Sequence, residues 1–136
     1  MIRYKQQILF IISAVFLAAC AIGADAPQTL EGKLAARNLI VGEPVKRISN
    51  YRMDGWAYLD DRHLIIESGA SDRYLVSLKT RCDDMRGAIN IGFRTYTGSL
   101  TDADSVVVRA TGGYTRNCLI DTLHELVRVN RDEDNE

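Results

Sequence analysis

The sequence lacks the short motifs that accompany the best-known catalytic chemistries. It contains neither the His-Glu-x-x-His pattern of zinc peptidases nor the Gly-x-Ser-x-Gly turn that presents a serine nucleophile. Gly112-Gly113 is not a phosphate-binding loop, because no Gly-Lys-Ser or Gly-Lys-Thr run accompanies it. The aspartates at 83–84 and at 102 and 104 lack the ordered ligand spacing of a calcium-binding EF-hand. We therefore expect a non-enzymatic protein without a cofactor or a metal site.

The chain also lacks an excess of one charge and a long apolar run. Its 17 basic and 18 acidic residues give a net charge of −1 over 136 residues. A nucleic-acid-binding protein normally concentrates basic side chains on one face, so nucleic acid is not an expected partner. The apolar stretch Ile8–Ala19 is shorter than the ~20 residues that a membrane-spanning helix needs. The length allows one domain with one modest core.

The first twenty residues have the organisation of an export signal. Arg3 and Lys5 precede the apolar run and small residues follow it, as in secretory signal peptides. The run LAAC at Leu17–Cys20 resembles the bacterial lipobox, which implies cleavage before Cys20 and acylation of its thiol. Several acyl chains together anchor a protein to a membrane almost permanently. A plain secretory signal and an uncleaved anchor are the alternatives.

Four regions follow from this interpretation. Residues 1–19 form a lipoprotein signal peptide, 20–44 the lipidated N-terminus and tether, 45–130 a β domain, and 131–136 an acidic tail. Ala21 is not the aspartate that commonly retains lipoproteins in the inner membrane. The expected location is therefore the cell envelope, at the periplasmic leaflet of the outer membrane.

The stretch Gly55–Leu78 predicts three antiparallel strands in a meander. Its three apolar runs alternate in polarity and are rich in aromatic and β-branched residues. Residues 60–62, DDR, and the small polar residues 68–72 separate the runs at spacings that suit hairpins. The alternation places Trp56 and Tyr58 on one face.

The remaining segments extend this sheet. We expect strands at 88–94 and 106–110, an edge strand at 45–48, a loop at 95–105, a helical turn within 79–87 and a short helix or irregular segment at 29–40. The segment Cys118–Arg128 fits a helix or a strand, and the turn before it favours the strand. The expected fold is mainly β, with five to seven short antiparallel strands in a curled sheet or small open barrel, one disulfide and little helix.

Cys82 and Cys118 remain once Cys20 is assigned to lipidation. An even pair of cysteines in an oxidising compartment is expected to form a disulfide. The bond would join the loop before one strand to the start of the last strand. A redox-active or metal-binding pair is the alternative.

Two groups of residues in the meander are candidates for a site. Asp60, Asp61 and His63 could supply acid–base or metal chemistry, but aspartate is also a standard turn residue. The aromatic group could form a ligand or partner surface, although strand aromatics more often belong to the core. The residues of this possible surface are Trp56, Tyr58, Tyr74 and His63.

A third candidate group lies in the last strand. His124 could bind a metal together with Asp121 and Glu125 if the segment were a helix. In a strand the two carboxylates share a face and the imidazole lies opposite. A strand therefore disfavours this metal site.

Several motifs of the domain resemble a known family. They are Met53-Asp54-Gly55-Trp56, Leu59-Asp60-Asp61-Arg62-His63-Leu64, Tyr74-Leu75-Val76, Cys82, Ile91-Gly92-Phe93-Arg94 and Cys118-Leu119-Ile120. Together they resemble a family of small lipoproteins of Gram-negative bacteria, catalogued as a domain of unknown function, over about Arg47–Arg128. The resemblance implies a periplasmic, mainly β domain with Cys82 paired to Cys118. It implies no catalytic or binding residue.

These observations favour a lipid-anchored binding or envelope-accessory module. It would meet the membrane through acylated Cys20 and an envelope protein through a sheet face or edge. One alternative is a small-molecule or lipid carrier with a pocket under Trp56. Another is a periplasmic hydrolase that uses Asp60, Asp61 and His63.

Overall fold

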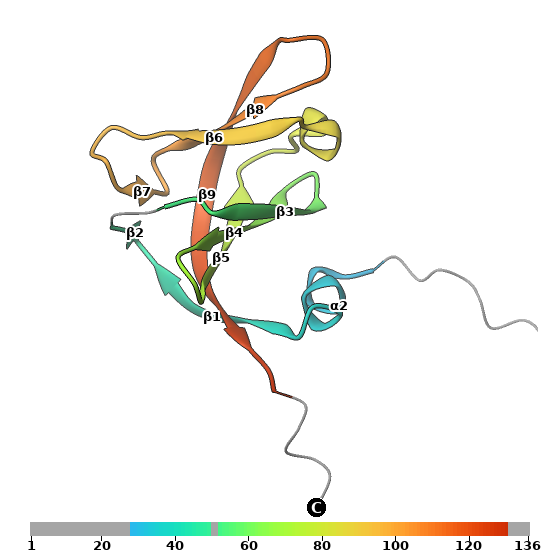
Figure 1. The fold of residues 1–136 in the computed structure, drawn as a ribbon, viewed down its shortest axis with the longest axis vertical. Coiled ribbons are helices and arrows are strands. Elements are labelled where there is room, and N and C mark those ends of the chain that lie inside the picture. The colour runs from blue at the N-terminus through green and yellow to red at the C-terminus, as the bar shows by residue number, and fades with distance from the viewer. Residues whose placement is uncertain (1–27, 50–51, 131–136) are drawn as a thin grey trace, which may run out of the picture.

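The computed structural model describes residues 28–49 and 52–130, which fold into a curled antiparallel half-barrel (Figure 1). The elements are α2 (Leu30–Ala35), β1 (Leu39–Val45), β2 (Arg47–Ile48), β3 (Gly55–Asp60), β4 (His63–Ser68), β5 (Asp72–Leu78), the 3-10 helix η1 (Asp83–Gly87), β6 (Asn90–Arg94), β7 (Leu100–Thr101), β8 (Ser105–Arg109) and β9 (Thr115–Arg128). The main sheet has the order β3-β4-β5-β9-β8-β6, with β1 also paired to β9, and β2 pairs with β7. The expected mainly β fold class is confirmed. No helix of the described residues is long and apolar enough to cross a membrane.

The central meander forms as its alternation predicts. β4 pairs antiparallel with both β3 and β5. The register sets Ile66 between Trp56 and Tyr74, so these three large side chains form one cross-strand row. Gly69, in the second turn, has a φ of 69°, which glycine adopts without the steric cost of a side chain.

The ambiguous segment Cys118–Arg128 belongs to β9, a strand of 14 residues, so the strand prediction is confirmed. A β-bulge explains its helix-like spacing of apolar residues. Pairing with β5 shifts between Ile120 and Thr122. Because the bulge inserts a residue, Ile120 and Leu123 both reach the core although they are three positions apart.

β9 is the central strand, because it pairs with three others. The Leu119 carbonyl accepts a hydrogen bond from the Lys79 amide (2.9 Å), and the Ile120 amide donates to the Asp104 carbonyl (3.1 Å). These two groups of one peptide unit point in opposite directions, so β5 and β8 lie on opposite edges of β9. Leu123 pairs with both β5 and β1, which places β1 on the same edge as β8.

Both faces of the sheet bury apolar side chains. We call the face that carries Leu64 and Ile66 the inner face, and it holds the larger core. This core comprises Ile48, Leu64, Ile66, Val76, Leu78, Cys82, Met85, Ile91, Leu100, Val106, Val108, Cys118, Ile120 and Leu123. The outer core lies between the sheet and α2 and comprises Leu34, Leu39, Leu59, Ile65, Leu75 and Leu126. Each fully buried side chain contributes roughly 1.5–3 kcal/mol to the stability.

Cys82 and Cys118 form the expected disulfide. Their Cα atoms are 6.0 Å apart and both residues are buried in the inner core. The bond ties the loop after β5 to β9 at the point where Cys118 pairs with Val106 of β8. It therefore fastens η1 and its loop across the inner face.

The β domain begins earlier than the predicted boundary at residue 45. β1 starts at Leu39 and pairs with β9 up to Val45. Gly42 and Pro44, which predict an end to local structure, instead fall at a register shift between Val41 and Pro44. A proline is tolerated at such an irregularity on an edge strand, because no ladder amide is needed there.

Two further boundaries also differ from the prediction. The expected edge strand at 45–48 is divided between the end of β1 and β2. β2 then pairs with β7, which lies inside the expected loop at 95–105. The expected short helix at 29–40 is confirmed only as α2, whose N-cap Thr29 accepts a hydrogen bond from the Gly32 amide at 3.1 Å.

Candidate functional site

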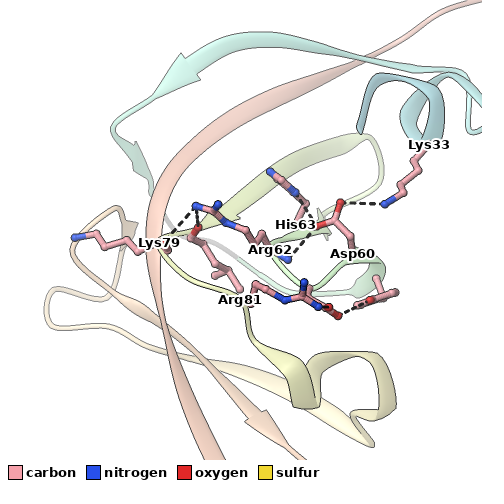
Figure 2. A network of polar contacts seen from close by, with 9 residues as sticks. Lys33, Asp60, Arg62, His63, Lys79 and Arg81 are labelled. Atoms are coloured by element: carbon pink, nitrogen blue, oxygen red, sulfur yellow. Dashed lines mark hydrogen bonds and ion pairs between the residues drawn. The ribbon is translucent and has the colours of Figure 1, made fainter. Parts of the chain in front are cut away.

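The turn between β3 and β4 carries the acidic and imidazole side chains that the sequence singles out (Figure 2). Asp60 ends β3 and His63 begins β4. Asp60 Oδ1 accepts a hydrogen bond from the Arg62 amide (2.9 Å) and lies 2.8 Å from His63 Nδ1. The carboxylate therefore closes the turn from which it projects, as aspartate commonly does.

The second oxygen of Asp60 reaches the helix. Asp60 Oδ2 lies 3.1 Å from Lys33 Nζ, and Figure 2 shows Lys33 extending from α2 toward it. Burial raises the pKa of the Asp60 carboxyl, but hydrogen bonds from the Arg62 amide, the His63 ring and Lys33 outweigh it and lower the pKa below its ordinary value. Asp60 is therefore a bound carboxylate and not a proton donor at neutral pH.

Asp61 points toward the loop that holds the disulfide. Its Oδ1 accepts a hydrogen bond from the Tyr58 hydroxyl (2.7 Å), and its Oδ2 forms an ion pair with Arg81. Its backbone carbonyl accepts a hydrogen bond from the Cys82 amide (2.7 Å). Burial, followed by the hydrogen bond to Asp61 and the charge of that carboxylate, raises the pKa of Tyr58 to about 12.

Arg62 completes the network by binding backbone groups. Its guanidinium donates to the carbonyls of Leu78 (3.4 Å) and Lys79 (3.1 Å), as Figure 2 shows. Its own carbonyl accepts a hydrogen bond from the Leu78 amide (2.8 Å). The turn thus joins α2, the β3–β4 hairpin, the end of β5 and the loop before η1. Its polar side chains hold the fold together.

An imidazole oriented by a carboxylate is also the arrangement of a general base. The sheet places Ser77 of β5 opposite His63, a neighbour that no sequence motif indicates. Within the described residues no hydrogen bond joins the Ser77 hydroxyl to His63. The turn therefore offers an oriented base without a bonded nucleophile.

The aromatic candidates lie on the inner face. Trp56, Tyr58 and Tyr74 are half-buried and pack against the inner core. His63 lies on the opposite face because it neighbours Leu64, so the structure does not bring it together with this group. Tyr74 also lines a shallow pocket of about 140 Å³. Burial, with the charges of Asp72 and Glu125, raises the pKa of Tyr74.

The remaining candidate residues are placed as follows. His124 lies opposite Leu75, and its buried Nδ1 has no hydrogen-bond partner among the described residues. Asp121 and Glu125 are exposed. Among residues 28–49 and 52–130, no three His, Cys, Asp or Glu side chains form a group that could hold a metal ion. Cys20 lies outside the described residues.

Two surface features were not found from the sequence. We define the apolar ribbon as the exposed residues Ile40, Val127 and Val129. We define the arginine groove as the hollow of about 220 Å³ lined by Arg37, Leu39, Ala57, Ile65, Glu67, Arg73 and Arg128. Each unites residues that are far apart in the chain. No periodicity or motif signals such a set, because its members meet only through strand pairing. The pairing of β1 with β9 forms the apolar ribbon, and the groove also needs the pairing of β5 with β9.

The chain is similar to one described family of proteins. A family of unknown function, DUF6491, matches residues 3–135. The chain belongs to this family. No curated protein and no solved structure matches the chain.

The match to DUF6491 confirms the expected membership of a family of unknown function, and it extends beyond the motifs between Arg47 and Arg128 over nearly the whole chain. DUF6491 assigns no activity, because its description is that of a family of unknown function. A functional proposal for this DUF6491 domain therefore depends on its own surfaces.

Proposed function

We propose that the chain is a lipid-anchored, non-enzymatic binding module of the bacterial cell envelope. Acylated Cys20 would hold it at the periplasmic leaflet of the outer membrane, where it would recruit a protein partner. The lipobox-like leader supports the anchor. The buried Cys82–Cys118 disulfide supports an oxidising compartment, because cytosolic thiols are normally kept reduced.

The apolar ribbon is the observation that carries this proposal. Ile40 of β1 and Val127 of β9 pair across the two strands and are 51% and 48% exposed. Val129 follows the last residue of β9, its amide donates to the Asn38 carbonyl (2.9 Å), and it is 40% exposed. Contiguous exposed apolar side chains are costly to leave in water and commonly mark an interaction surface.

The open edge of β1 adds a second means of binding. Pairing between β5 and β9 ends at Glu125, so beyond it β1 and β9 continue as a two-stranded ribbon (Figure 1). Within the described residues β1 pairs only with β9. Its other edge can therefore accept a strand from a partner, whose apolar side chains would cover Ile40 and Val127.

The chain order places this surface near the proposed anchor. The ten residues from Cys20 to Leu30 reach at most about 36 Å when fully extended. α2 follows at once, and a pocket of about 260 Å³ between α2 and β1 is lined by Leu34, Ile40 and Val41. A partner bound to the apolar ribbon would therefore lie close to the membrane surface.

Site-specific photocrosslinking in living Gram-negative cells tests the proposal. A photoreactive residue at position 40 should capture a defined envelope protein, and Val127→Asp in the same chain should abolish the adduct. Position 119 is the matched control, since Leu119 is 54% exposed on the same strand but lies at its other end. An identical adduct pattern at positions 40 and 119 would overturn the proposal.

The anchor is tested separately by Cys20→Ser. The wild-type chain should incorporate labelled fatty acid and sediment with membranes, whereas the variant should do neither. A variant that still carries the label would show that Cys20 is not the acylated residue.

The Asp60–His63 contact of 2.8 Å favours hydrolysis as a second candidate function. A hydrolase would lose turnover of a simple ester on His63→Gln, with Ser77→Ala as the test of a nucleophile. The binding-module proposal expects neither variant to change the background rate. A fold-preserving His63→Gln variant that lost a measurable activity would favour the hydrolase.

A further inference from the structure

We propose that the arginine groove is a binding site for a small amphiphilic anion, a carboxylate or phosphate borne on a short apolar chain. The groove lies on the outer face of the sheet, away from Trp56 and the inner core. This inference is independent of the apolar ribbon and of lipidation. It assigns a ligand site in place of the pocket under Trp56 that the sequence suggests.

Three elements bring the cations of the groove together. Arg37 lies in the turn after α2, where Asn38 adopts a left-handed φ of 57° before β1 begins. Arg128 ends β9 and pairs in register with Leu39 of β1. Arg73 projects from β5 on the same face as Leu75 of the outer core. The groove is thus a product of the tertiary fold.

The charges of the groove do not balance. Arg73 is satisfied, since its Nε lies 3.0 Å from Glu67 Oε1. Arg37 and Arg128 form no ion pair with any described residue. Three guanidinium groups and one carboxylate therefore line one hollow, which leaves two positive charges uncompensated. Like charges held at a concave surface favour a bound anion, because the low-dielectric wall focuses their field.

Arginine is suited to this ligand chemistry. Its planar guanidinium donates two parallel hydrogen bonds to a carboxylate or phosphate, which a lysine amine does not. Several other arginines of this chain are exposed and lie apart from one another, and contact with solvent alone explains their presence. Arg37 and Arg128 differ because they share a hollow with a third arginine and an apolar floor.

The floor of the groove defines the rest of the ligand. Ile65 and Leu39 are 2% and 5% exposed, and Ala57 beside them is half-buried. An apolar chain lying on these side chains would remove further apolar surface from water. The volume of about 220 Å³ is below the roughly 300 Å³ at which drug-sized sites begin, so the ligand is small.

Calorimetry on the full chain in zwitterionic lipid discs tests the proposal, with empty discs subtracted. The probes are hexanoate and hexyl phosphate, with acetate, inorganic phosphate and hexylamine as comparisons. We expect both hexyl anions to bind, the two short anions to bind at least about tenfold more weakly, and hexylamine not to bind. The hexanoate and hexyl phosphate arms show whether the site prefers a carboxylate or a phosphate.

Arg37→Gln and Arg128→Gln should each weaken hexyl-anion binding at least about tenfold, because each removes a charged hydrogen-bond donor. Arg109→Gln is the matched control, since Arg109 is exposed on β8 at the opposite end of β9. Equal losses in all three variants would reveal general charge attraction and overturn the proposal. Circular dichroism of each variant confirms that the fold persists.

The acidic residues that follow Arg128 in sequence could compete for the groove. Replacing Asp132, Glu133, Asp134 and Glu136 with their amides removes this competition in the full chain. Tighter hexanoate binding by that variant, again lost on Arg37→Gln, supports the site. Absence of binding by both the wild-type chain and the amide variant overturns it, whatever crosslinking at the apolar ribbon shows.

Discussion

Lys33 and Asp60, 27 positions apart, form an ion pair of 3.1 Å that joins the only described α-helix to the sheet. Both side chains are largely shielded from water, with exposures of 23% and 29%. Asp60 also closes its own turn through the Arg62 amide. One carboxylate therefore stabilises a local turn and a tertiary contact at the same time.

This pair should give a measurable coupling energy. We expect Lys33→Met and Asp60→Asn to interact by about 0.5–1 kcal/mol in a double-mutant cycle measured by urea unfolding. Asp60→Asn alone should cost more, about 1–3 kcal/mol, because its carboxylate serves three donors. Lys46→Met, at an exposed lysine without an ion pair among the described residues, is the control. Strict additivity of the two changes would contradict the role of the pair.

The same carboxylate should make the stability depend on acid pH. The pKa of Asp60 is lower in the folded protein than its ordinary value of 3.8, so the unfolded chain takes up the proton first as the pH falls. The stability that the Asp60 carboxylate contributes is complete above about pH 5, and it is lost as the pH falls through the pKa of the folded protein. Unfolding free energies at several pH values should decline more steeply for the wild type than for Asp60→Asn. Parallel declines would show that other groups cause the acid sensitivity.

Tyr58 should be the counterpart at alkaline pH. With its pKa raised to about 12, Tyr58 contributes stability that is present below its ordinary pKa of 10.0 and is lost as the pH rises toward 12. Because the pKa of Tyr74 is raised as well, ultraviolet titration should show more than one late phenolate transition, and Tyr58→Phe should remove one of them. Late transitions of undiminished amplitude in Tyr58→Phe would contradict the assignment to Tyr58.

Loss of the disulfide should be among the most destabilising changes to this domain. Cys82 and Cys118 are 36 positions apart, for which the chain-entropy estimate is about 3–4 kcal/mol. The double Cys82→Ala, Cys118→Ala variant should lose about this much in urea unfolding, and reductant should weaken the wild type alone. A change below about 1 kcal/mol would mean that the unfolded chain is already constrained in this region.

Two leucines of β9 test the register of the central strand. Leu123→Ala should cost about 2–5 kcal/mol, because Leu123 is 1% exposed within the inner core. Leu119→Ala, at 54% exposure on the same strand, should stay within about 0.5 kcal/mol. The same unfolding assay measures both variants. Similar losses would mean that the bulge lies elsewhere in β9.

The sequence predicted those parts of the fold whose signals are local. The β3–β5 meander follows from alternation and turn residues, and the Cys82–Cys118 bond follows from the parity of cysteines. β1 was placed in the tether because its partner, β9, comes last in the chain and Pro44 resembles a stop signal. The sequence pattern thus fails at the pairing of β1 with β9, which joins strands that are far apart in the chain.

The candidate site shows the same division. Aspartates at 60 and 61 predicted a turn, which formed, but nothing in the sequence linked Asp60 to Lys33 or Asp61 to Arg81. Arg37, Arg73 and Arg128 are unremarkable separately, and the pairing of β9 with both β1 and β5 assembles them around one hollow. Charge balance can be judged only after such distant residues are placed.

The position of β9 also governs how the molecule is made. It is the last strand to leave the ribosome, yet β1, β5 and β8 all need it as a neighbour. Whether the chain emerges from the ribosome or from an export channel, the earlier segments must wait with open edges until β9 arrives. A chaperone that shields unpaired strands would therefore matter more here than for a protein built from successive hairpins.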